Sequence, residues 1–464
     1  TFGPRLADSW ETNEAQDKIT YHLNENAKWQ DGEPVTAEDV VYSAQVASSS
    51  EFNYLRRIRM QYFAGTDETG CETSTDSIEV AALDDHTVEF TLKAPMDPAI
   101  IYALVNRDFF IMPKHLLDSI SDADLVNDAF WQKPIGSGPC IFDSMESGVS
   151  IEFKANKDYY LKTPQWDRFV VKVVATPSLL SGLMNDEIDI LAGNVASLQL
   201  SDWDMAQQQQ NLTCVSTESV GYQYMAINTE KDYLPPKVRQ AIDMAINRDA
   251  IVSGLLKGEG EPAFGPFATS HKYYDDVVNV GYNPEKAKEL LAEAGYPDGF
   301  EVTLDAPNDR YMNDEQIAQA VAGYLEKVGI KVNLNLMPKA NFFSYIKPLE
   351  NKSMFLMTGW SDASGDGLSL MHDMLYTYDR EAGNGGVNRG HYSNAQVDAL
   401  IDQAFTEMDD TKRGELVAEA DKIAREDYAY IPLHFEQDTY AIKDTLNYTP
   451  RMNKYVYAWE FSYK

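Results

Sequence analysis

The sequence predicts an α/β protein in which a parallel β-α-β unit is combined with an antiparallel α+β region. Three observations favour this fold class. Strand and helix patterns alternate between residues 283 and 360, and apolar residues alternate along short segments near the N-terminus. The chain also enters a helix-rich region near residue 222 and leaves it near residue 430. Two crossings between two parts of a chain indicate two lobes joined by a hinge.

Residues 1–120 are expected to form an α+β unit with antiparallel strands. Apolar and polar residues alternate along "KITYHLNE" and "TVEFTLKAP", which is typical of strands with one buried face. Between them, "TAEDVVYSAQVA" predicts a helix, with Thr36 as the N-cap and Asp39 as the acidic half of a capping box. The inner face of this helix is expected to consist of Val40, Ala44 and Ala47.

From about residue 135 the pattern changes to short strands and helices. Strands are expected around 151–153 and 169–174, and "SLLSGLMNDEIDIL" predicts a helix that leads into a strand. After the strand-like "GYQYMAINT", the segment "PPKVRQAIDMAINRDAIVSGLL" carries apolar residues at helical spacing. This segment begins the helix-rich region.

The segment 283–360 indicates a β-α-β unit. Asn283 is the expected N-cap of a helix with Pro284 in its first turn. The strand "FEVTLDAP", the amphipathic helix "NDEQIAQAVAGYLEKVG" and the strand "IKVNLNLMP" follow, and "MFLMTGW" is a third strand. We expect parallel strands with a right-handed crossover, an arrangement in which ligands bind beyond the carboxyl ends of the strands. Two further amphipathic helices and the strand-like "YIPLHFEQDTYAIKD" come after this unit.

The loops after these strands carry the candidate binding residues. The loop "DAPNDRYMND" contains Arg310 and Tyr311. The third strand ends at Trp360, before the polar and glycine-rich "SDASGDG", which contains Asp362 and Asp366. Because the carboxyl ends of parallel strands meet at one edge of a sheet, these residues are expected to share a binding edge. Glycines at this edge let the backbone approach a ligand closely.

Each candidate also has a structural interpretation. Trp360, Tyr311 and Tyr222 are candidates for the apolar walls of a site. Trp360 could instead end a strand in the core, and Tyr222 fits a core role equally well. Arg310 could bind a carboxylate through two hydrogen bonds, or it could be a solvated or structural arginine. Asp362 could accept hydrogen bonds from a solute or merely solvate a turn.

Charge and hydropathy exclude several classes of protein. The chain has 39 basic and 73 acidic residues and a formal net charge of −34, so neither a phosphate backbone nor an anionic membrane is an expected partner. The acidic surface is interpreted as a source of solubility. No stretch approaches the roughly 18 consecutive apolar residues of a membrane span, and residues 1–8 lack the features of a signal peptide. We expect a soluble chain, either mature or trimmed.

Cysteine and acidic patterns predict no metal and no cofactor. The three cysteines form no C-x-x-C pair, which argues against a zinc framework and leaves open one disulfide with an odd thiol. The polar loop after Trp360 matches the spacing of a calcium loop, but that pattern needs a preceding helix and a final glutamate. The seven histidines show no local cluster for nickel. The residues concerned are Cys71, Cys140 and Cys214, and for calcium Asp362, Ser364, Asp366, Gly367 and Asp373.

Catalysis is not expected either. The chain contains no G-x-S-x-G, no H-E-x-x-H, no P-loop and no G-x-G-x-x-G that opens a helix. The glycine-rich "GEGEPAFG" and "GNGGVNRG" are interpreted as loops of a binding cleft. The acidic pair Asp409 and Asp410 lies in a charged connector between two helices, where both side chains are expected to be solvated.

Several longer motifs carry a family resemblance. "PRLADSWE", "YHLNENAKWQDGEPVTAEDVVYSA", "GSGPCIF", "VRQAIDMAINRDAIVSGLLKGEG", "YNPEKAKELLAEAGYPDGF" and "YSNAQVDALIDQAF" occur in this order. Together they resemble the peptide-type solute-binding proteins of ABC importers, family 5, which includes dipeptide, oligopeptide, glutathione and nickel binders. The resemblance covers nearly the whole chain, and it implies a two-lobed, periplasmic-binding-protein type II-like fold with an extra α+β subdomain.

The resemblance also implies how the chain is divided and what it does. The subdomain would span 1–120, lobe I 121–221 plus 430–464, and lobe II 222–429. The cleft between the lobes would capture a peptide or peptide-like solute without chemistry and deliver it to permease subunits in the membrane. A monomer is expected, in the periplasm or, in a bacterium with a single membrane, outside the cell on a lipid anchor.

Two departures from the family pattern affect these expectations. Family members usually have a further segment before "LADSWE", including the first strand of lobe I, so the resemblance implies a shortened chain. Peptide binders also resemble G-W-x-x-D, with the aspartate on the ligand's amino group, whereas the fifth position here is Ala363. The resemblance therefore leaves open a non-peptide solute, such as a glutathione-like molecule, an oligosaccharide or a nickel chelate.

Overall fold

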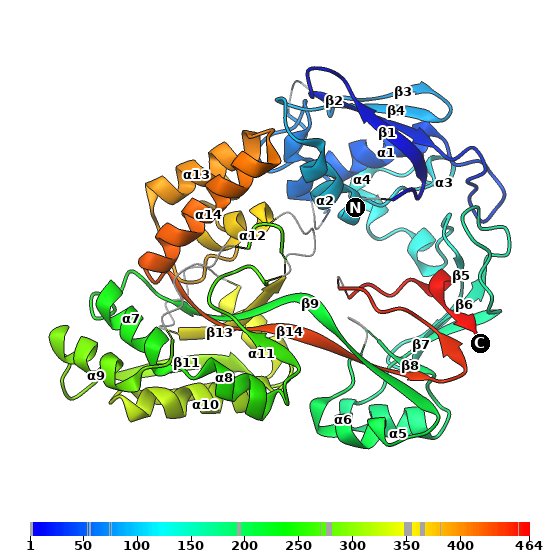
Figure 1. Cartoon of the computed structure of the whole chain (residues 1–464). Coiled ribbons are helices and arrows are strands. Elements are labelled where there is room, and N and C mark those ends of the chain that lie inside the picture. Colours follow the sequence, from blue (N-terminus) through cyan, green and yellow to red (C-terminus); the bar gives the residue numbers. More distant parts are fainter. Residues whose placement is uncertain are drawn as a thin grey trace.

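The computed structural model describes residues 3–464, except 53, 55–56, 74, 76, 193–195, 270, 275–280, 348–354, 362–366, 381 and 453. Figure 1 shows three parts arranged around the middle of the molecule. The subdomain is formed by β1–β4 and α1–α4, lobe I by β5–β8, α5, α6 and the C-terminal segment, and lobe II by α7–α14 with β11–β13. In the part of the chain that the structure describes, no helix is both long and apolar enough to cross a membrane.

The subdomain is built on a four-stranded antiparallel sheet of order β1-β2-β4-β3, as the alternating segments predict. Its strands are β1 (Ala7–Thr12), β2 (Lys18–Leu23), β3 (Val80–Asp84) and β4 (Thr87–Thr91). Its helices are α1 (Ala37–Ser48), η1 (Arg57–Tyr62), α2 (Pro98–Asp108), α3 (Lys114–Leu117), α4 (Asp122–Leu125) and η2 (Ala129–Gln132). The predicted capping box is confirmed, because the Thr36 amide donates to the Asp39 carboxylate over 2.8 Å at the start of α1.

Lobe I contains a three-stranded antiparallel sheet of order β5-β6-β7. The predicted helix that leads into a strand is confirmed as α5 followed by β8, which pairs with β14. The elements of this lobe are β5 (Cys140–Glu146), β6 (Ser150–Ala155), β7 (Arg168–Lys172), η3 (Thr176–Ser178), α5 (Leu179–Met184), β8 (Ile190–Leu191), α6 (Leu200–Gln207), β15 (Leu446–Asn447), η5 (Ala458–Glu460) and β16 (Ser462–Tyr463).

Lobe II is organised by the β-α-β unit that the sequence predicts. Strand β11 (Glu301–Pro307) is parallel to β12 (Lys331–Met337) and to β13 (Phe355–Ser361), with α10 (Asp314–Lys327) between the first two. The Asn283 side chain caps α9 by accepting a hydrogen bond from the Lys286 amide, as predicted. The other elements are α7 (Pro236–Ala245), α8 (Arg248–Ala250), η4 (Ile251–Leu255), β10 (Gly260–Pro262), α9 (Pro284–Glu293), α11 (Lys339–Ile346), α12 (Leu368–Leu375), α13 (Ala395–Thr406) and α14 (Asp410–Glu426).

Two long strands join the lobes. Strands β9 (Leu212–Ile227) and β14 (Tyr430–Lys443) pair with each other in antiparallel fashion (Figure 1). Strand β9 runs from lobe I into lobe II, and β14 runs back into lobe I. Their register shifts between Pro432 and His434 and again between Phe435 and Gln437. Such irregularities bend a strand and increase its local twist, so the two crossing strands form a natural hinge. Helices α4 and η2 lie beyond the predicted limit at residue 120 but pack against α1, so they are described with the subdomain. The residue limits of the three parts remain a prediction.

Alternate residues of β9 serve two different cores. Tyr222 and Tyr224 face a cluster that runs continuously from the subdomain to α12–α14. Met225 and Ile227 face a second cluster between the sheet and α7, α9 and α10. The first cluster shows that the subdomain packs against lobe II in this structure.

Candidate functional site

Trp360 lies at the carboxyl end of β13, opposite Tyr222 of β9. Its side chain is only partly buried and packs against the cluster shared by the subdomain and lobe II. Asp362 and Asp366, the other candidates in this loop, lie outside the described residues. The structure thus places the tryptophan at the end of a strand, where a partly exposed ring can contact a solute.

Tyr311 contacts the backbone of Gly359, the residue before Trp360, at the edge where the two strands end. Its hydroxyl accepts a hydrogen bond from the Gly359 amide at 3.0 Å and lies 3.4 Å from the Gly359 carbonyl oxygen. The loop itself is fixed by the buried Asp314 carboxylate, which accepts the amides of Arg310 and Tyr311 at 2.8 and 3.0 Å. Tyr311 therefore ties the end of β11 to the end of β13.

Arg310 is exposed, and its guanidinium lies 4.9 Å from the centre of the Tyr311 ring. Stacking on an aromatic face is a common position for an arginine at a surface, because the guanidinium is weakly hydrated. This position agrees with the structural interpretation of Arg310 and leaves its charge available to a ligand.

Tyr222 occupies the core. It is 1% exposed, and its ring stacks on Tyr224 with a centroid distance of 5.5 Å and lies 5.3 Å from Phe435. Burial raises the pKa of its hydroxyl well above the usual value. The structure favours the core role over the role of a cleft wall, the two alternatives that the sequence left open.

A polar group of four residues sits where the crossing strands leave lobe II. We call Gln223, Glu436, Asp438 and Lys454 the crossing cluster. The Gln223 amide donates to Glu436 over 2.6 Å, and the Lys454 ammonium donates to Glu436 at 2.6 Å and to Asp438 at 3.0 Å. Lys454 comes from the C-terminal segment of lobe I, so the cluster connects both lobes.

Two glycines make room for the crossing cluster. A Cβ atom on Gly221 would overlap the Glu436 carboxylate, and one on Gly359 would overlap the Gln223 amide. The contacts therefore run without a break from Tyr311 through Gly359 and Gln223 to the crossing cluster. Glycine is required at both positions for side chains from β9 and β14 to approach the backbone this closely.

Burial and ion pairing compete within the crossing cluster. Burial alone would raise the pKa of Glu436, but Lys454 and Gln223 outweigh it and lower that pKa. For Asp438 burial dominates and the pKa is raised, despite the favourable charge of Lys454. Burial also lowers the pKa of the neighbouring His434 to about 4, so this imidazole is neutral near pH 7. Two carboxylates thus share one ammonium, and the Asp438 Oδ2 atom finds no partner among the described residues.

The sequence of β14 contains a signal for this cluster. Strand β14 is almost fully buried, yet "YIPLHFEQDTYAIK" places His434, Glu436 and Asp438 at every second position. Charged residues are rarely buried unless they are paired. Polar residues inside such a strand therefore predict a functional or structural network.

The C-terminal segment adds aromatic side chains on lobe I. Tyr457 lies 4.6 Å from Trp459 and 6.4 Å from Tyr455, measured between ring centroids. Arg451 stacks over Tyr457 at 4.9 Å, and Arg5 stacks over Trp459 at 5.7 Å. In Figure 1 this segment, in red, reaches back toward the middle of the molecule. Lys454 belongs to the same segment, so these aromatic residues are close in sequence to a member of the crossing cluster.

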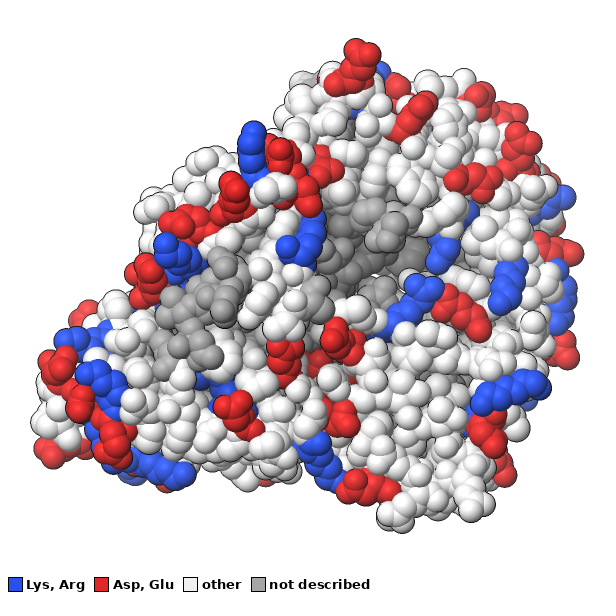
Figure 2. All heavy atoms as spheres, in the orientation of Figure 1, with Lys and Arg blue, Asp and Glu red and all other residues white. Residues whose placement is uncertain are grey.

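Figure 2 shows that the surface is hollowed in the middle of the molecule, between lobe II, the subdomain and lobe I. Acidic and basic side chains lie around the rim of this hollow. This hollow lies where the two-lobed expectation places a cleft.

The calcium and disulfide hypotheses concern residues only partly described. Of the calcium-loop pattern, Gly367 and Asp373 are described, at the start and inside α12, and the remaining positions fall outside the description. Among the described residues, no group of three His, Cys, Asp or Glu side chains could hold a metal ion. The calcium hypothesis stays untested.

Cys71, Cys140 and Cys214 are all free thiols, so no disulfide forms between them.

The acidic pair between the last two helices is more structured than predicted. Asp409 is the N-cap of α14, where its carboxylate accepts the amides of Thr411 and Lys412. Asp410 pairs with Lys272 at 2.9 Å and with Arg413 at 2.7 Å. The Asp410 side chain is 61% exposed, which agrees with the expected solvation, and its two ion pairs are a further feature that the sequence did not predict.

Known proteins resemble this chain in sequence and, for one solved structure, in fold. Di/tripeptide-binding protein 1 of Pseudomonas aeruginosa is 29% identical over 448 residues, which cover 93% of this chain and 80% of the relative. Heme-binding protein A of Haemophilus influenzae is 27% identical over 449 residues, which cover 93% of this chain and 78% of the relative. The oligopeptide-binding protein AppA from Bacillus subtilis, in complex with a nonapeptide, has a similar structure. Its TM-score is 0.80 at 25% identity, over 99% of this chain and 90% of that one.

The family assignment rests on a match over most of the chain. Residues 1–382 match the sequence pattern of the "Bacterial extracellular solute-binding proteins, family 5 Middle". The match includes the subdomain, the β-α-β unit and Trp360. The chain therefore belongs to the bacterial extracellular solute-binding proteins of family 5.

Proposed function

We propose that this chain binds a peptide or peptide-like solute in the cleft between its lobes and delivers it to the permease subunits of an ABC importer. The relatives named as di/tripeptide-binding and oligopeptide-binding proteins support this proposal. The observation that carries it is the continuous run of contacts from Tyr311 on lobe II to Lys454 of lobe I, beside the partly exposed Trp360. A solute held there touches both lobes at once.

The residues of this edge suit an extended polar ligand with varied side chains. Trp360 supplies an aromatic wall, and the exposed Arg310 supplies a cation that can bind a carboxylate through two hydrogen bonds. Peptide recognition of this kind relies on backbone hydrogen bonds for affinity and on hydrated pockets that tolerate different side chains. Asp362 and Asp366 stay candidates for the amino group of the ligand.

Binding would act by shifting a population. A solute that contacts both lobes stabilises the closed arrangement, because only that arrangement makes both sets of contacts. The register shifts in β14 provide the place where the two crossing strands can bend. We propose that the permease recognises the closed form, and that the chain acts as a monomer and without catalysis, outside the cytoplasmic membrane. The compartment is the periplasm or, in a bacterium with one membrane, the cell surface through a lipid anchor.

A non-peptide solute is the second candidate. Ala363 occupies the position at which the peptide-type pattern has an aspartate, so the expected partner of a free amino group is absent from that position. The relative named as a heme-binding protein shows that proteins similar to this chain are not all named for peptides. A glutathione-like molecule, an oligosaccharide or a nickel chelate would be the alternative ligands.

Mass spectrometry of small molecules released from the purified protein would identify the solute class. The identified ligand is then titrated by calorimetry into the wild type and into Trp360→Ala. We expect the variant to lose about 1 to 3 kcal/mol of binding free energy, because an aromatic wall is removed. The control is Trp131→Ala, which removes a 40% exposed tryptophan of the subdomain that is not part of the candidate edge.

Two outcomes would contradict the proposal. If Trp360→Ala is folded and binds normally, the ligand site lies elsewhere. Asp362→Asn should weaken peptides with a free amino group more than amine-blocked peptides, because only the free amine carries a charge that the carboxylate can pair. Equal affinities for both peptides would show that Asp362 is no anchor and would favour the non-peptide alternative.

A further inference from the structure

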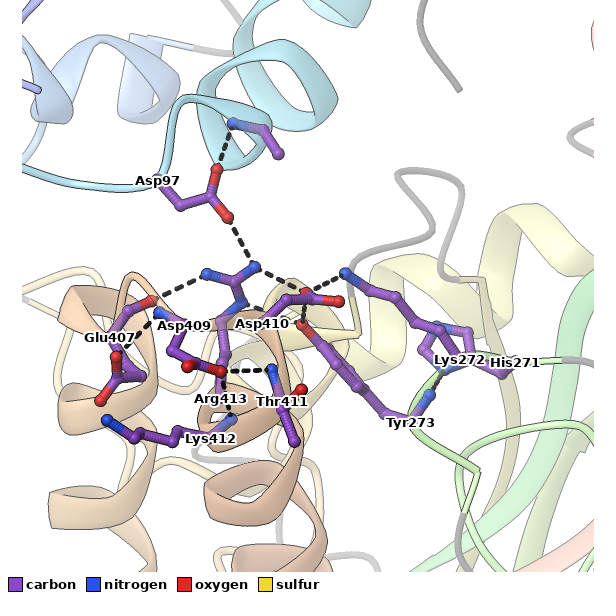
Figure 3. A network of polar contacts seen from close by, with 11 residues as sticks. Asp97, His271, Lys272, Tyr273, Glu407, Asp409, Asp410, Thr411, Lys412 and Arg413 are labelled. Atoms are coloured by element: carbon purple, nitrogen blue, oxygen red, sulfur yellow. Dashed lines mark hydrogen bonds and ion pairs between the residues drawn. The ribbon is translucent and has the colours of Figure 1, made fainter.

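Arg413 lies in the first turn of α14 and is 3% exposed, yet its guanidinium is surrounded by hydrogen-bond acceptors (Figure 3). Its Nε donates to the Tyr273 hydroxyl at 2.9 Å, and one terminal nitrogen donates to the Glu407 carbonyl at 2.8 Å. The other terminal nitrogen donates to Asp410 at 2.7 Å and to Asp97 at 2.5 Å. The first three partners belong to lobe II, and Asp97 belongs to the subdomain.

Asp97, the subdomain partner of Arg413, accepts hydrogen bonds from two different elements. Asp97 is the N-cap of α2, where its Oδ1 accepts the Ala99 amide at 2.9 Å. Its Oδ2 accepts the hydrogen bond from Arg413. The carboxylate is therefore held in place by its own helix, and its second oxygen points out of the subdomain toward α14, as Figure 3 shows.

The surroundings keep Arg413 in position whether or not Asp97 is present. Asp410 is held by Lys272 at 2.9 Å and by the Tyr273 hydroxyl at 2.9 Å, and Lys272 in turn lies 4.4 Å from the Tyr273 ring centre. The hydrogen bond from Lys272 lowers the pKa of Asp410 to about 2, so this carboxylate stays ionised beside Arg413. Loss of Asp97 would leave the guanidinium with an anionic partner and two neutral acceptors.

This arrangement differs from an ordinary buried ion pair. Breaking such a pair is costly because the remaining charge stays buried without a partner. Here the contact can open without that penalty, because both ends keep other hydrogen bonds inside their own part. Both side chains are already held by other hydrogen bonds, so forming the contact costs little side-chain entropy. The contact therefore favours the closed arrangement over the open one.

We infer that Asp97 and Arg413 form a latch that stabilises the closed arrangement of the subdomain against lobe II and thereby sets the population from which the solute is bound. The inference rests on the two-lobed closure in the proposed function and adds the pair of residues that biases it. The apolar cluster shared by the two parts is buried in the same arrangement, so the latch acts together with that cluster. When the closed fraction falls, the apparent affinity falls in proportion.

Asp97→Asn tests the latch, because asparagine is as good an N-cap as aspartate but lacks the charge that Arg413 pairs with. The matched control is Asp409→Asn, which makes the same change at the N-cap of α14, four residues from Arg413 and entirely within lobe II. Small-angle X-ray scattering of the ligand-free proteins measures closure. We expect Asp97→Asn to lower the ratio of closed to open molecules roughly fivefold or more and to raise the radius of gyration. Asp409→Asn should scatter like the wild type.

Scattering curves of Asp97→Asn that superimpose on the wild type, in protein shown by circular dichroism to be folded, would overturn the latch. So would an equal expansion of Asp409→Asn, because a loss of helix capping would then explain both. Adding a tryptic digest of casein as a peptide probe separates this inference from the proposed function. If the digest lowers the radius of gyration of neither the wild type nor any variant, the proposal of peptide binding fails. The comparison of the ligand-free proteins still tests the latch in that case.

Discussion

Two arginines on the same helix show how position changes what a buried charge does. Arg413 and Arg425 both lie on α14, about 18 Å apart along its axis. They are 3% and 1% exposed. Arg425 pairs with Asp243 of α7, within lobe II, at 3.4 Å, and it stacks on Tyr430 at the start of the crossing strand β14 at 5.4 Å. Arg413 has partners in lobe II as well, but it also reaches Asp97 of the subdomain.

The two arginines differ in what the loss of their partner should change: the stability of lobe II for Arg425, and the closure of the molecule for Arg413. Asp243 is fully buried and holds both Arg248 and Arg425, so three charges depend on one another inside a single lobe. That network can only be broken by damaging the fold of lobe II. The contact between Asp97 and Arg413 crosses a boundary between two parts, and it can open while each part stays folded. We therefore expect changes at Asp243 to affect unfolding and changes at Asp97 to affect closure.

The largest expected effect follows from Asp243→Asn. The substitution leaves Arg248 and Arg425 buried with no carboxylate between them, which should cost about 3 to 5 kcal/mol of the free energy of unfolding. Urea denaturation followed by circular dichroism measures this loss. Asp97→Asn, measured in the same way, should lose far less. If both variants are destabilised equally, the pair across the boundary is structural and the comparison between the two arginines fails.

His434 extends the comparison to a buried base that can give up its charge. Arginine stays charged in a protein, so Arg425 needs Asp243, whereas the buried His434 can remain neutral. Burial lowers its pKa to about 4, below the ordinary value of 6.5. The unfolded chain therefore binds a proton at His434 between pH 6.5 and 4 that the folded chain does not, and stability falls as the pH is lowered through this window.

Up to about 3 kcal/mol of stability should be lost in this way, and His434→Gln should remove that part of the loss. Denaturation at a series of pH values, for the wild type and the variant, gives the difference directly. Carboxylates distant from His434 titrate alike in both proteins, so their contribution cancels in the difference, whereas Glu436 interacts with His434 and belongs to the measured effect. If the wild type and His434→Gln lose the same unfolding free energy between pH 6.5 and 4, His434 does not take up a proton on unfolding in that range.

Gly359→Ala addresses the contacts that join the lobes at the candidate site. The new methyl group would overlap the Gln223 amide and lie 2.8 Å from a Tyr311 ring carbon. We expect a loss of about 1 to 3 kcal/mol in unfolding free energy, since the crowded side chains must move, together with weaker solute binding. Gly323→Ala is the control, because Gly323 lies in α10 with open space around it and its replacement should stabilise the helix. Unchanged binding by Gly359→Ala would separate the crossing cluster from the solute site.

Much of this fold could be predicted because its signals are local. The capping box at Thr36, the cap at Asn283 and the parallel unit from β11 to β12 follow from side chains a few residues apart or from the period of apolar residues. Trp360 and Tyr311 could be placed at one edge by the same reasoning, because topology fixes where parallel strands end.

The remaining features depend on contacts between residues far apart in the chain. Nothing near Gln223 in the sequence shows that Glu436 and Lys454 will surround it. The ion pair between Asp410 and Lys272 could not be predicted, because Lys272 lies in another loop. Tyr222 could not be assigned to the core or to the cleft, because both positions require an aromatic residue in a strand. Local patterns specify which elements form, and only the packed lobes specify which charges meet.

The smallest expected effect comes from a third ion pair on α14, the one between Glu419 and Lys422. Their charged atoms lie 3.7 Å apart, and both side chains are 49% exposed, so water screens the pair and both side chains keep much of their freedom. Glu419→Gln should therefore change the free energy of unfolding by less than about 0.5 kcal/mol and leave the scattering curve unchanged. These three pairs of opposite charge on one helix then differ in whether their removal affects the fold, the closure or neither. A loss above 1 kcal/mol for Glu419→Gln would mean that α14 responds to any lost charge, and the distinct roles of Arg413 and Arg425 would no longer follow from their surroundings.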